Sequence, residues 1–192
     1  MTVAKSHSRT ALQKSLFATL RLCVCATLLL TSCATAPPAP LVSPEWDMVP
    51  SGVIDVVCTR LRDDAISTVS VVKTTQRIAT PQALATLGGS YGKRTSNDRM
   101  TEALAAGQRS LPVETKSVVC SVDAIERLDS RVHADAMILE LSSPLPNPFA
   151  RGEAGLFARV SLGGQHAAWY WIPLGRAGNS WMAGQALPLM GL

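Results

Sequence analysis

The feature that most constrains this chain is Leu22–Leu30, a charge-free and almost wholly apolar run of nine residues that ends shortly before Cys33. A helix needs about 20 apolar residues to span a membrane, so this run is too short for a permanent transmembrane segment. A basic beginning, a short apolar stretch and small residues after it are the parts of a secretory signal peptide. The basic residues ahead of the run are Lys5, Arg9, Lys14 and Arg21.

The four residues Leu30–Thr31–Ser32–Cys33 resemble the lipobox of bacterial lipoproteins. The resemblance implies cleavage before Cys33 and lipidation of that cysteine, which becomes the first residue of the mature protein. Lipoproteins similar to this one carry three acyl chains, and each buried methylene contributes about 0.8 kcal/mol to membrane binding. Because Ala34 and not Asp follows the cysteine, the resemblance to Gram-negative family members implies the outer membrane, with the protein facing the periplasm.

Two other interpretations of this region remain open. Ala34–Thr35–Ala36 is similar to the A-x-A site of ordinary secretion, although Pro37 would then stand directly after the cut. Alternatively, Cys33 merely follows an apolar helix. The neighbouring Cys23 and Cys25 are poor lipidation candidates, because the residues before them are not small.

The charge of the chain changes once the signal peptide is removed. The whole sequence has a formal net charge of +4, but four of its 18 Lys and Arg residues precede Cys33 and all 14 Asp and Glu residues follow it. The mature side chains therefore sum to zero. A nucleic-acid-binding domain needs a concentrated basic surface, and only the pair Lys93–Arg94 stands out, so we expect no nucleic acid as a partner.

Proline marks the boundary of the folded domain. Five prolines fall between Pro37 and Pro50, and because proline fixes φ and lacks an N–H, this stretch predicts an extended spacer. We divide the chain into a signal peptide over 1–32, a lipidated cysteine with a proline-rich tether over 33–50, and a single periplasmic domain over 51–192. A domain of that length can bury its own core.

The first half of the domain predicts short helices. Apolar residues recur at helical spacing over Val53–Leu61, and Ser67–Thr75 is rich in strand-forming residues. Thr80 and Pro81 supply an N-cap and a first helical residue for a helix that continues to Leu87 and stops at Gly88–Gly89. A second helix begins at Asn97 or Asp98 and ends near Gly107.

The second half predicts strands. Val118–Val122 is expected to be a strand, and Asp123 to cap a single helical turn that reaches Leu128. The class is α+β, with a C-terminal antiparallel β-meander and short N-terminal helices packed on one face of it. The meander comprises Ala136–Leu141, Leu156–Leu162, Ala168–Leu174 and Trp181–Leu187, with Gly163–Gly164 as a hairpin turn.

Two cysteines, Cys58 and Cys120, remain in the domain. Disulfides persist in exported proteins, and a bridge closing a loop of about 60 residues would stabilise the domain by roughly 4 kcal/mol. Two separate buried thiols are the alternative, because a free cysteine packs as a small apolar side chain.

The strongest catalytic motif is Gly88–Gly89–Ser90–Tyr91–Gly92, which matches the G-x-S-x-G pattern of a nucleophile elbow. Asp135 and His166 could complete a triad in the required order. The predicted context contradicts this assignment, because a helix and not a buried strand precedes Ser90. The nearby Gly92–Lys93 lacks the other residues of a phosphate loop.

Metal binding is weakly indicated. His133–Ala134–Asp135 places two candidate ligands on one side of an extended segment, whereas zinc sites need three or four ligands. We expect no metal and no cofactor.

Aromatic residues give the clearest binding hypothesis. Trp169 and Trp171 share one face of a predicted strand, and Phe157 lies on the adjacent strand. One interpretation is that helices and loops cover these rings. The other is an exposed patch centred on Phe157, Trp169 and Trp171, since exposed apolar patches mark interaction sites.

The sequence therefore predicts a membrane-anchored bacterial envelope lipoprotein whose domain binds another envelope component without catalysis. The alternative is a small serine hydrolase that uses Ser90. Replacing Ser90 with Ala discriminates the two: loss of function at unchanged folding and abundance would favour the enzyme.

Overall fold

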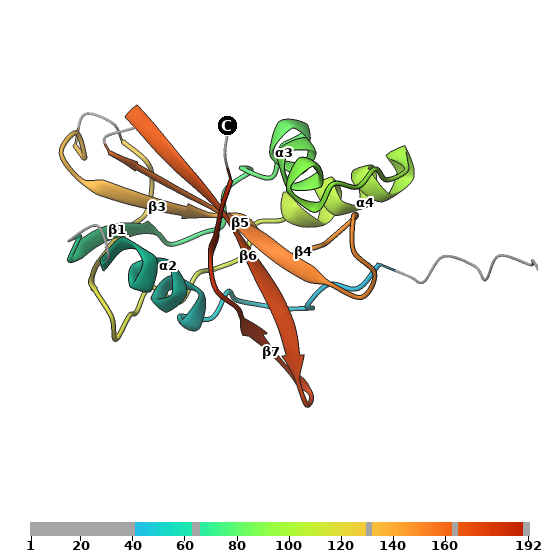
Figure 1. The fold of residues 1–192 in the computed structure, drawn as a ribbon. Coiled ribbons are helices and arrows are strands. Elements are labelled where there is room, and N and C mark those ends of the chain that lie inside the picture. Colours follow the sequence, from blue (N-terminus) through green and yellow to red (C-terminus); the bar gives the residue numbers. More distant parts are fainter. Residues whose placement is uncertain (1–40, 63–65, 130–131, 163–164, 190–192) are drawn as a thin grey trace, which may run out of the picture. The chain divides into compact units, whose positions relative to one another are not determined.

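The computed structural model describes residues 41–62, 66–129, 132–162 and 165–189. Within these ranges the chain forms three helices and a curled, mixed eight-stranded sheet (Figure 1). This confirms the predicted α+β class, in which strands dominate the second half of the domain. The expected hairpin turn at Gly163–Gly164 lies outside the described residues.

The sheet combines the expected meander with a parallel extension. β3, β5, β6 and β7 are antiparallel neighbours, whereas β1 runs parallel to both β2 and β3. In sheet order the strands are β2 (Ser121–Ile125), β1 (Thr68–Val72), β3 (Met137–Leu141), β5 (Ala154–Leu162), β6 (Gln165–Ala177) and β7 (Ser180–Ala183), with β4 (Leu145–Pro146) paired to β5 and β8 (Leu187–Leu189) paired to β6.

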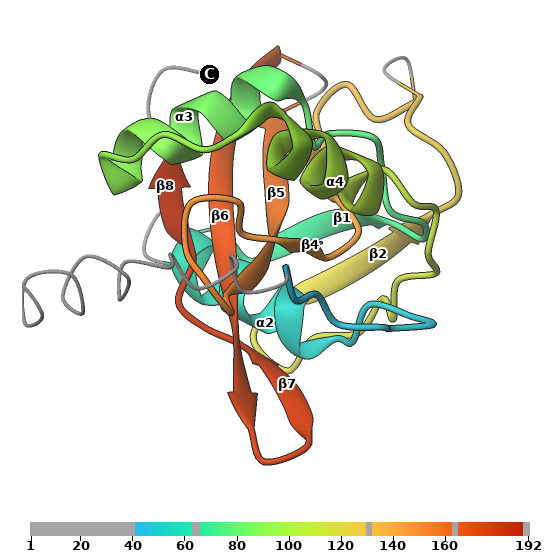
Figure 2. The same cartoon turned by 90° about the vertical axis from the view of Figure 1, so that its right-hand side faces the viewer.

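Helices cover both faces of the sheet, not one as the predicted meander implies. Side chains alternate along β5, so Leu156 packs with helix α2 (Gly52–Arg62) on one face while Phe157 packs with α3 (Pro81–Tyr91) on the other. Helix α4 (Asn97–Gly107) lies beside α3, and the two views in Figures 1 and 2 separate this pair from α2. Because β5 and β6 carry apolar side chains on both faces, each face must be shielded from water by other elements.

Helix α3 corrects the predicted end of the first connecting helix. Thr80 caps it and Pro81 begins it, as expected, but Gly88–Gly89 does not stop it. The helix continues to Tyr91 and ends at Gly92, which adopts φ 60°, a left-handed conformation that glycine accepts at little cost. Gly88 instead lets the ring of Phe149 pack closely against the helix, because a Cβ there would lie 2.6 Å from that ring.

Other elements also differ from the sequence prediction. The predicted strand Val118–Val122 lies later, as β2, and Asp123 is a strand residue opposite Ser70 and not a helix cap. Pairing with β1 outweighs the local capping preference of Asp123. The predicted strand Trp181–Leu187 divides into β7 and β8, which pair with the late and early parts of β6 respectively.

The described part of the predicted tether packs on the domain. Val49 is 0% exposed, its N–H donates to the carbonyl of Pro112, and its own carbonyl accepts from the N–H of Glu114. Trp46 packs against the core beneath α2. Residues 41–50 are therefore part of the fold, and only the residues between Cys33 and Leu41 stay a predicted spacer.

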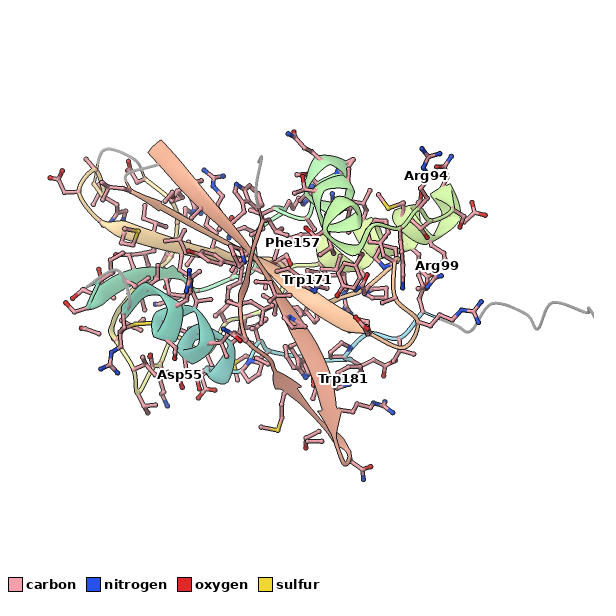
Figure 3. All side chains as sticks on the ribbon, in the orientation of Figure 1. Asp55, Arg94, Arg99, Phe157, Trp171 and Trp181 are labelled. Atoms are coloured by element: carbon pink, nitrogen blue, oxygen red, sulfur yellow. A yellow bond between two sulfur atoms is a disulfide. The ribbon has the colours of Figure 1, made fainter. Side chains whose placement is uncertain are left out.

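A disulfide joins Cys58 on α2 to Cys120, which lies just before β2. The same segment is held by Asp55 of α2, whose Oδ1 accepts from the Ser117 hydroxyl at 2.6 Å and from the Val118 N–H at 2.9 Å (Figure 3). Loop closure over 62 residues is expected to contribute about 4 kcal/mol by the chain-entropy model.

The pairing of β5 with β6 brings Phe157 opposite Trp171 beneath α3. Their ring centroids lie 5.1 Å apart in an edge-to-face arrangement, worth about 0.5–1.5 kcal/mol beyond their burial. The indole also lies against Gly155, where any Cβ would overlap it. Gly155 is thus required for the Trp171 ring to pack flat on the sheet.

Gly155→Ala is predicted to lower the free energy of unfolding by about 1–3 kcal/mol, because the added methyl forces the Trp171 ring out of its place. Chemical denaturation measures the loss. Gly175→Ala is the matched control, since a Cβ at Gly175 of β6 meets nothing within 4 Å. Equal stability of the two variants would contradict the packing argument.

Candidate binding groove

Ser90 is not in a nucleophile elbow. It lies in the last turn of α3, its hydroxyl donates to the Thr86 carbonyl at 3.2 Å, and a helix, not a strand, precedes it. Asp135 is exposed in the loop before β3, and the side chain of His166 lies outside what the structure describes. The geometry therefore lends no support to a hydrolase built on Ser90.

The predicted aromatic patch is wrong for two of its three residues. Phe157 and Trp171 are 0% exposed and form the core under α3 and α4 (Figure 3). Trp169 is half-buried, packs against the same core, and has the Arg159 guanidinium 5.9 Å from its ring centroid. Phe157 and Trp171 therefore hold the fold together and do not form a docking surface.

The metal hypothesis gains no support within the described ranges, where no group of three or more His, Cys, Asp or Glu side chains is placed to hold an ion. The backbone N–H of His133 donates to the Asp129 carbonyl in a turn. The basic pair Lys93–Arg94 borders a shallow hollow of about 550 Å³ beside Gly92, in the link between α3 and α4.

A larger groove, of about 830 Å³, lies on another part of the domain. Three segments far apart in the sequence line it: the start of the described chain, the end of α4, and the β6–β7 hairpin. The lining residues used below are Leu41, Val42, Glu45, Arg109, Arg176 and Trp181. We call this site the 41–45/α4/β7 groove.

Two hydrogen bonds tie the walls of the groove together. The hydroxyl of Ser43 donates to the Pro144 carbonyl at 3.3 Å, and the hydroxyl of Ser143 donates to the Ala106 carbonyl of α4 at 2.5 Å. Both Ser143 and Pro144 are buried between β3 and β4. The groove is therefore supported by the sheet and does not depend on loops alone.

The groove presents two cationic side chains beside an aromatic ring. Arg176 and Trp181 face each other across the β6–β7 hairpin, with the guanidinium 5.2 Å from the ring centroid. Arg109 follows α4, and its Nε donates to the Ala106 carbonyl at 3.3 Å. Within the described ranges neither arginine forms an ion pair. Both guanidinium groups are exposed and retain free donors for an anion.

A phenol and a carboxylate meet at the end of α3. The Tyr91 hydroxyl donates to Glu153 Oε2 at 3.1 Å, and the Asn147 side-chain amide donates to the same oxygen at 3.2 Å. Burial, followed by the negative charge of Glu153, raises the pKa of Tyr91. A phenol with a raised pKa stays protonated at neutral pH, so Tyr91 acts here as a hydrogen-bond donor that ties α3 to the β4–β5 loop.

A buried charge pair crosses the middle of the sheet. Glu140 of β3 is 4% exposed, and its Oε2 lies 3.4 Å from Nε of Arg159, the residue opposite it on β5. Burial raises the pKa of Glu140, and the positive charge of Arg159 opposes this shift. Because the carboxyl is enclosed, its protonation affects stability and not chemistry on a substrate.

The groove residues are not predicted by any motif in the sequence. Arg109 and the Arg176–Trp181 pair are far apart in the chain, and the fold alone brings them to one site. A signal for the pair exists: Gly178–Asn179 makes a two-residue turn between Ala177 and Ser180, which places Arg176 opposite Trp181. Nothing in the sequence indicates that residues 41–45 line a site, because the proline-rich stretch around them predicts a spacer.

No protein-family model, no curated protein and no solved structure matches this chain. Among the residues that the structure describes, no helix is long and apolar enough to cross a membrane.

The raised pKa of Glu140 predicts a pH dependence of stability. The folded protein holds this proton more tightly than the unfolded chain does, so the contribution is full below the ordinary glutamate pKa and is lost as the pH rises through the raised value. Glu140→Gln removes this component. The free energy of unfolding of the wild type minus that of Glu140→Gln should therefore fall as the pH rises from the ordinary glutamate pKa through the raised value. Parallel pH profiles would contradict the assignment.

Proposed function

We propose that this chain is a bacterial envelope lipoprotein, anchored through lipid on Cys33 and acting as a non-enzymatic binding domain at the periplasmic face of the outer membrane. One observation carries the proposal: a lipobox-like sequence, Leu30–Cys33, stands only ten residues ahead of Ser43, whose hydroxyl donates to the Pro144 carbonyl of the domain. The Cys58–Cys120 disulfide supports export, because such bonds persist outside the cytoplasm.

The short spacer restricts where the domain works. The ten residues from Cys33 to Ser43 reach at most about 36 Å when fully extended. The domain is therefore held near the bilayer, and the segment 41–45, which lines the groove, is the described part that follows the spacer most closely along the chain. This placement favours a role at the membrane surface over a role with a distant partner in the periplasm.

A binding role is favoured over catalysis by the side chains at the groove. Arg109, Arg176 and Trp181 can attract and hold an anionic or amphipathic partner, whereas no described group there is placed as a nucleophile with a base. The partner is expected to be another component of the envelope.

Substitution of Cys33 tests the anchor. In a Gram-negative host, Cys33→Ser should abolish incorporation of a labelled fatty acid and leave an uncleaved precursor, because the acylated sulfur is gone. Cys25→Ser is the matched control and should be processed and labelled as wild type. Wild-type labelling of Cys33→Ser, or its loss in Cys25→Ser alone, would contradict the proposal.

Ala34→Asp tests the location. In lipoproteins of this type Asp after the cysteine implies retention at the inner membrane, so the variant should move from the outer- to the inner-membrane fraction on a density gradient while its lipidation is unchanged. An unchanged distribution would contradict the outer-membrane assignment.

A further inference from the structure

The 41–45/α4/β7 groove combines cations, an acid and an interfacial ring at the end of the domain where the chain enters it. We propose that this groove binds the phosphoethanolamine headgroup of a lipid in the membrane that holds the anchor. The inference rests on the proposed function, because it takes the bilayer near the groove from the lipid on Cys33.

The two arginines fit the phosphate. A guanidinium group offers a planar fork of donors that matches phosphate oxygens, and it is less strongly hydrated than an ammonium group. Arg109 and Arg176 line the same groove from different walls, so both can contribute donors to an anion bound in it. Since neither arginine forms an ion pair in the described ranges, no carboxylate has to be displaced first.

Glu45 selects the kind of headgroup. Its carboxylate is exposed on the wall formed by residues 41–45, and it would repel a simple anion held by the arginines. A headgroup that carries an ammonium group next to its phosphate complements both the positive arginines and the negative Glu45. The primary amine of phosphoethanolamine can also donate hydrogen bonds to the carboxylate, which a quaternary amine cannot do.

The apolar side chains of the groove suit the boundary between lipid headgroups and acyl chains. Tryptophan favours the boundary between headgroups and acyl chains, where its apolar ring and polar N–H are both satisfied. Leu41 and Val42 line the same groove, are half-buried and contribute apolar surface. The mature chain has no net charge, so a general attraction to anionic lipid would not place the domain on the bilayer. Local contacts at the groove would place it there instead.

The test uses the full-length protein, purified with its lipid and reconstituted into phosphatidylcholine vesicles with or without phosphatidylethanolamine. Lipids brominated on the acyl chains quench tryptophans that lie at the bilayer. Wild type should be quenched more strongly when phosphatidylethanolamine is present. Trp181→Phe should lose this extra quenching, which assigns it to Trp181 and not to the other three tryptophans.

Arg109→Ala should abolish the extra quenching without changing near-ultraviolet circular dichroism, because Arg109 makes no contact with the Trp181 ring that the structure records. Arg109→Lys should recover part of it. Glu45→Gln should remove the preference for phosphatidylethanolamine over phosphatidylcholine. Arg127→Ala is the matched control, since Arg127 follows β2 at the opposite edge of the sheet, and it should behave as wild type.

Equal quenching of wild type, Trp181→Phe and Arg109→Ala on protein whose mass includes the lipid would overturn this inference and leave the proposed function standing. Equal quenching of wild type with and without phosphatidylethanolamine would overturn it as well. Protein without lipid on Cys33 would overturn the proposed function and, with it, the inference.

Discussion

The pairing of β5 with β6 is the interaction on which the rest of the domain depends. Its side chains are apolar on both faces, so the sheet is stable only if each face is covered. Helix α2 covers the face that carries Leu156, while α3 and α4 cover Phe157 and Trp171. Gly155 lets the Trp171 ring approach the sheet, and the buried pair Glu140–Arg159 continues the same face toward β3.

That constraint also explains how the groove arises. The end of α4 is held to the β3–β4 corner because Ser143 donates to Ala106, and the start of the domain is held to the same corner by Ser43. The β6–β7 hairpin extends beyond the helices and brings Arg176 and Trp181 to the remaining side. The segment that follows the predicted anchor thus becomes a wall of the site.

The sequence predicted most of the fold where the hydrophobic pattern was strong, as in α2, β3, β5 and β6. It missed features that depend on residues distant in the chain. Helix α3 continues through Gly88, which packs against the distant Phe149, and the strand at Asp123 depends on pairing with β1. The same limit applies to the site: Phe157 and Trp171 carried the aromatic signal but belong to the core, whereas Arg109 and Trp181 meet only through the topology.

We propose that lipid on Cys33 holds a folded binding domain against the membrane. The mass of the N-terminal peptide, measured on protein purified from membranes, tests this anchor. We expect a peptide that begins at Cys33 and carries the mass of a lipid on that residue. A peptide that begins at Pro37, or one that retains the residues before Cys33, would contradict it.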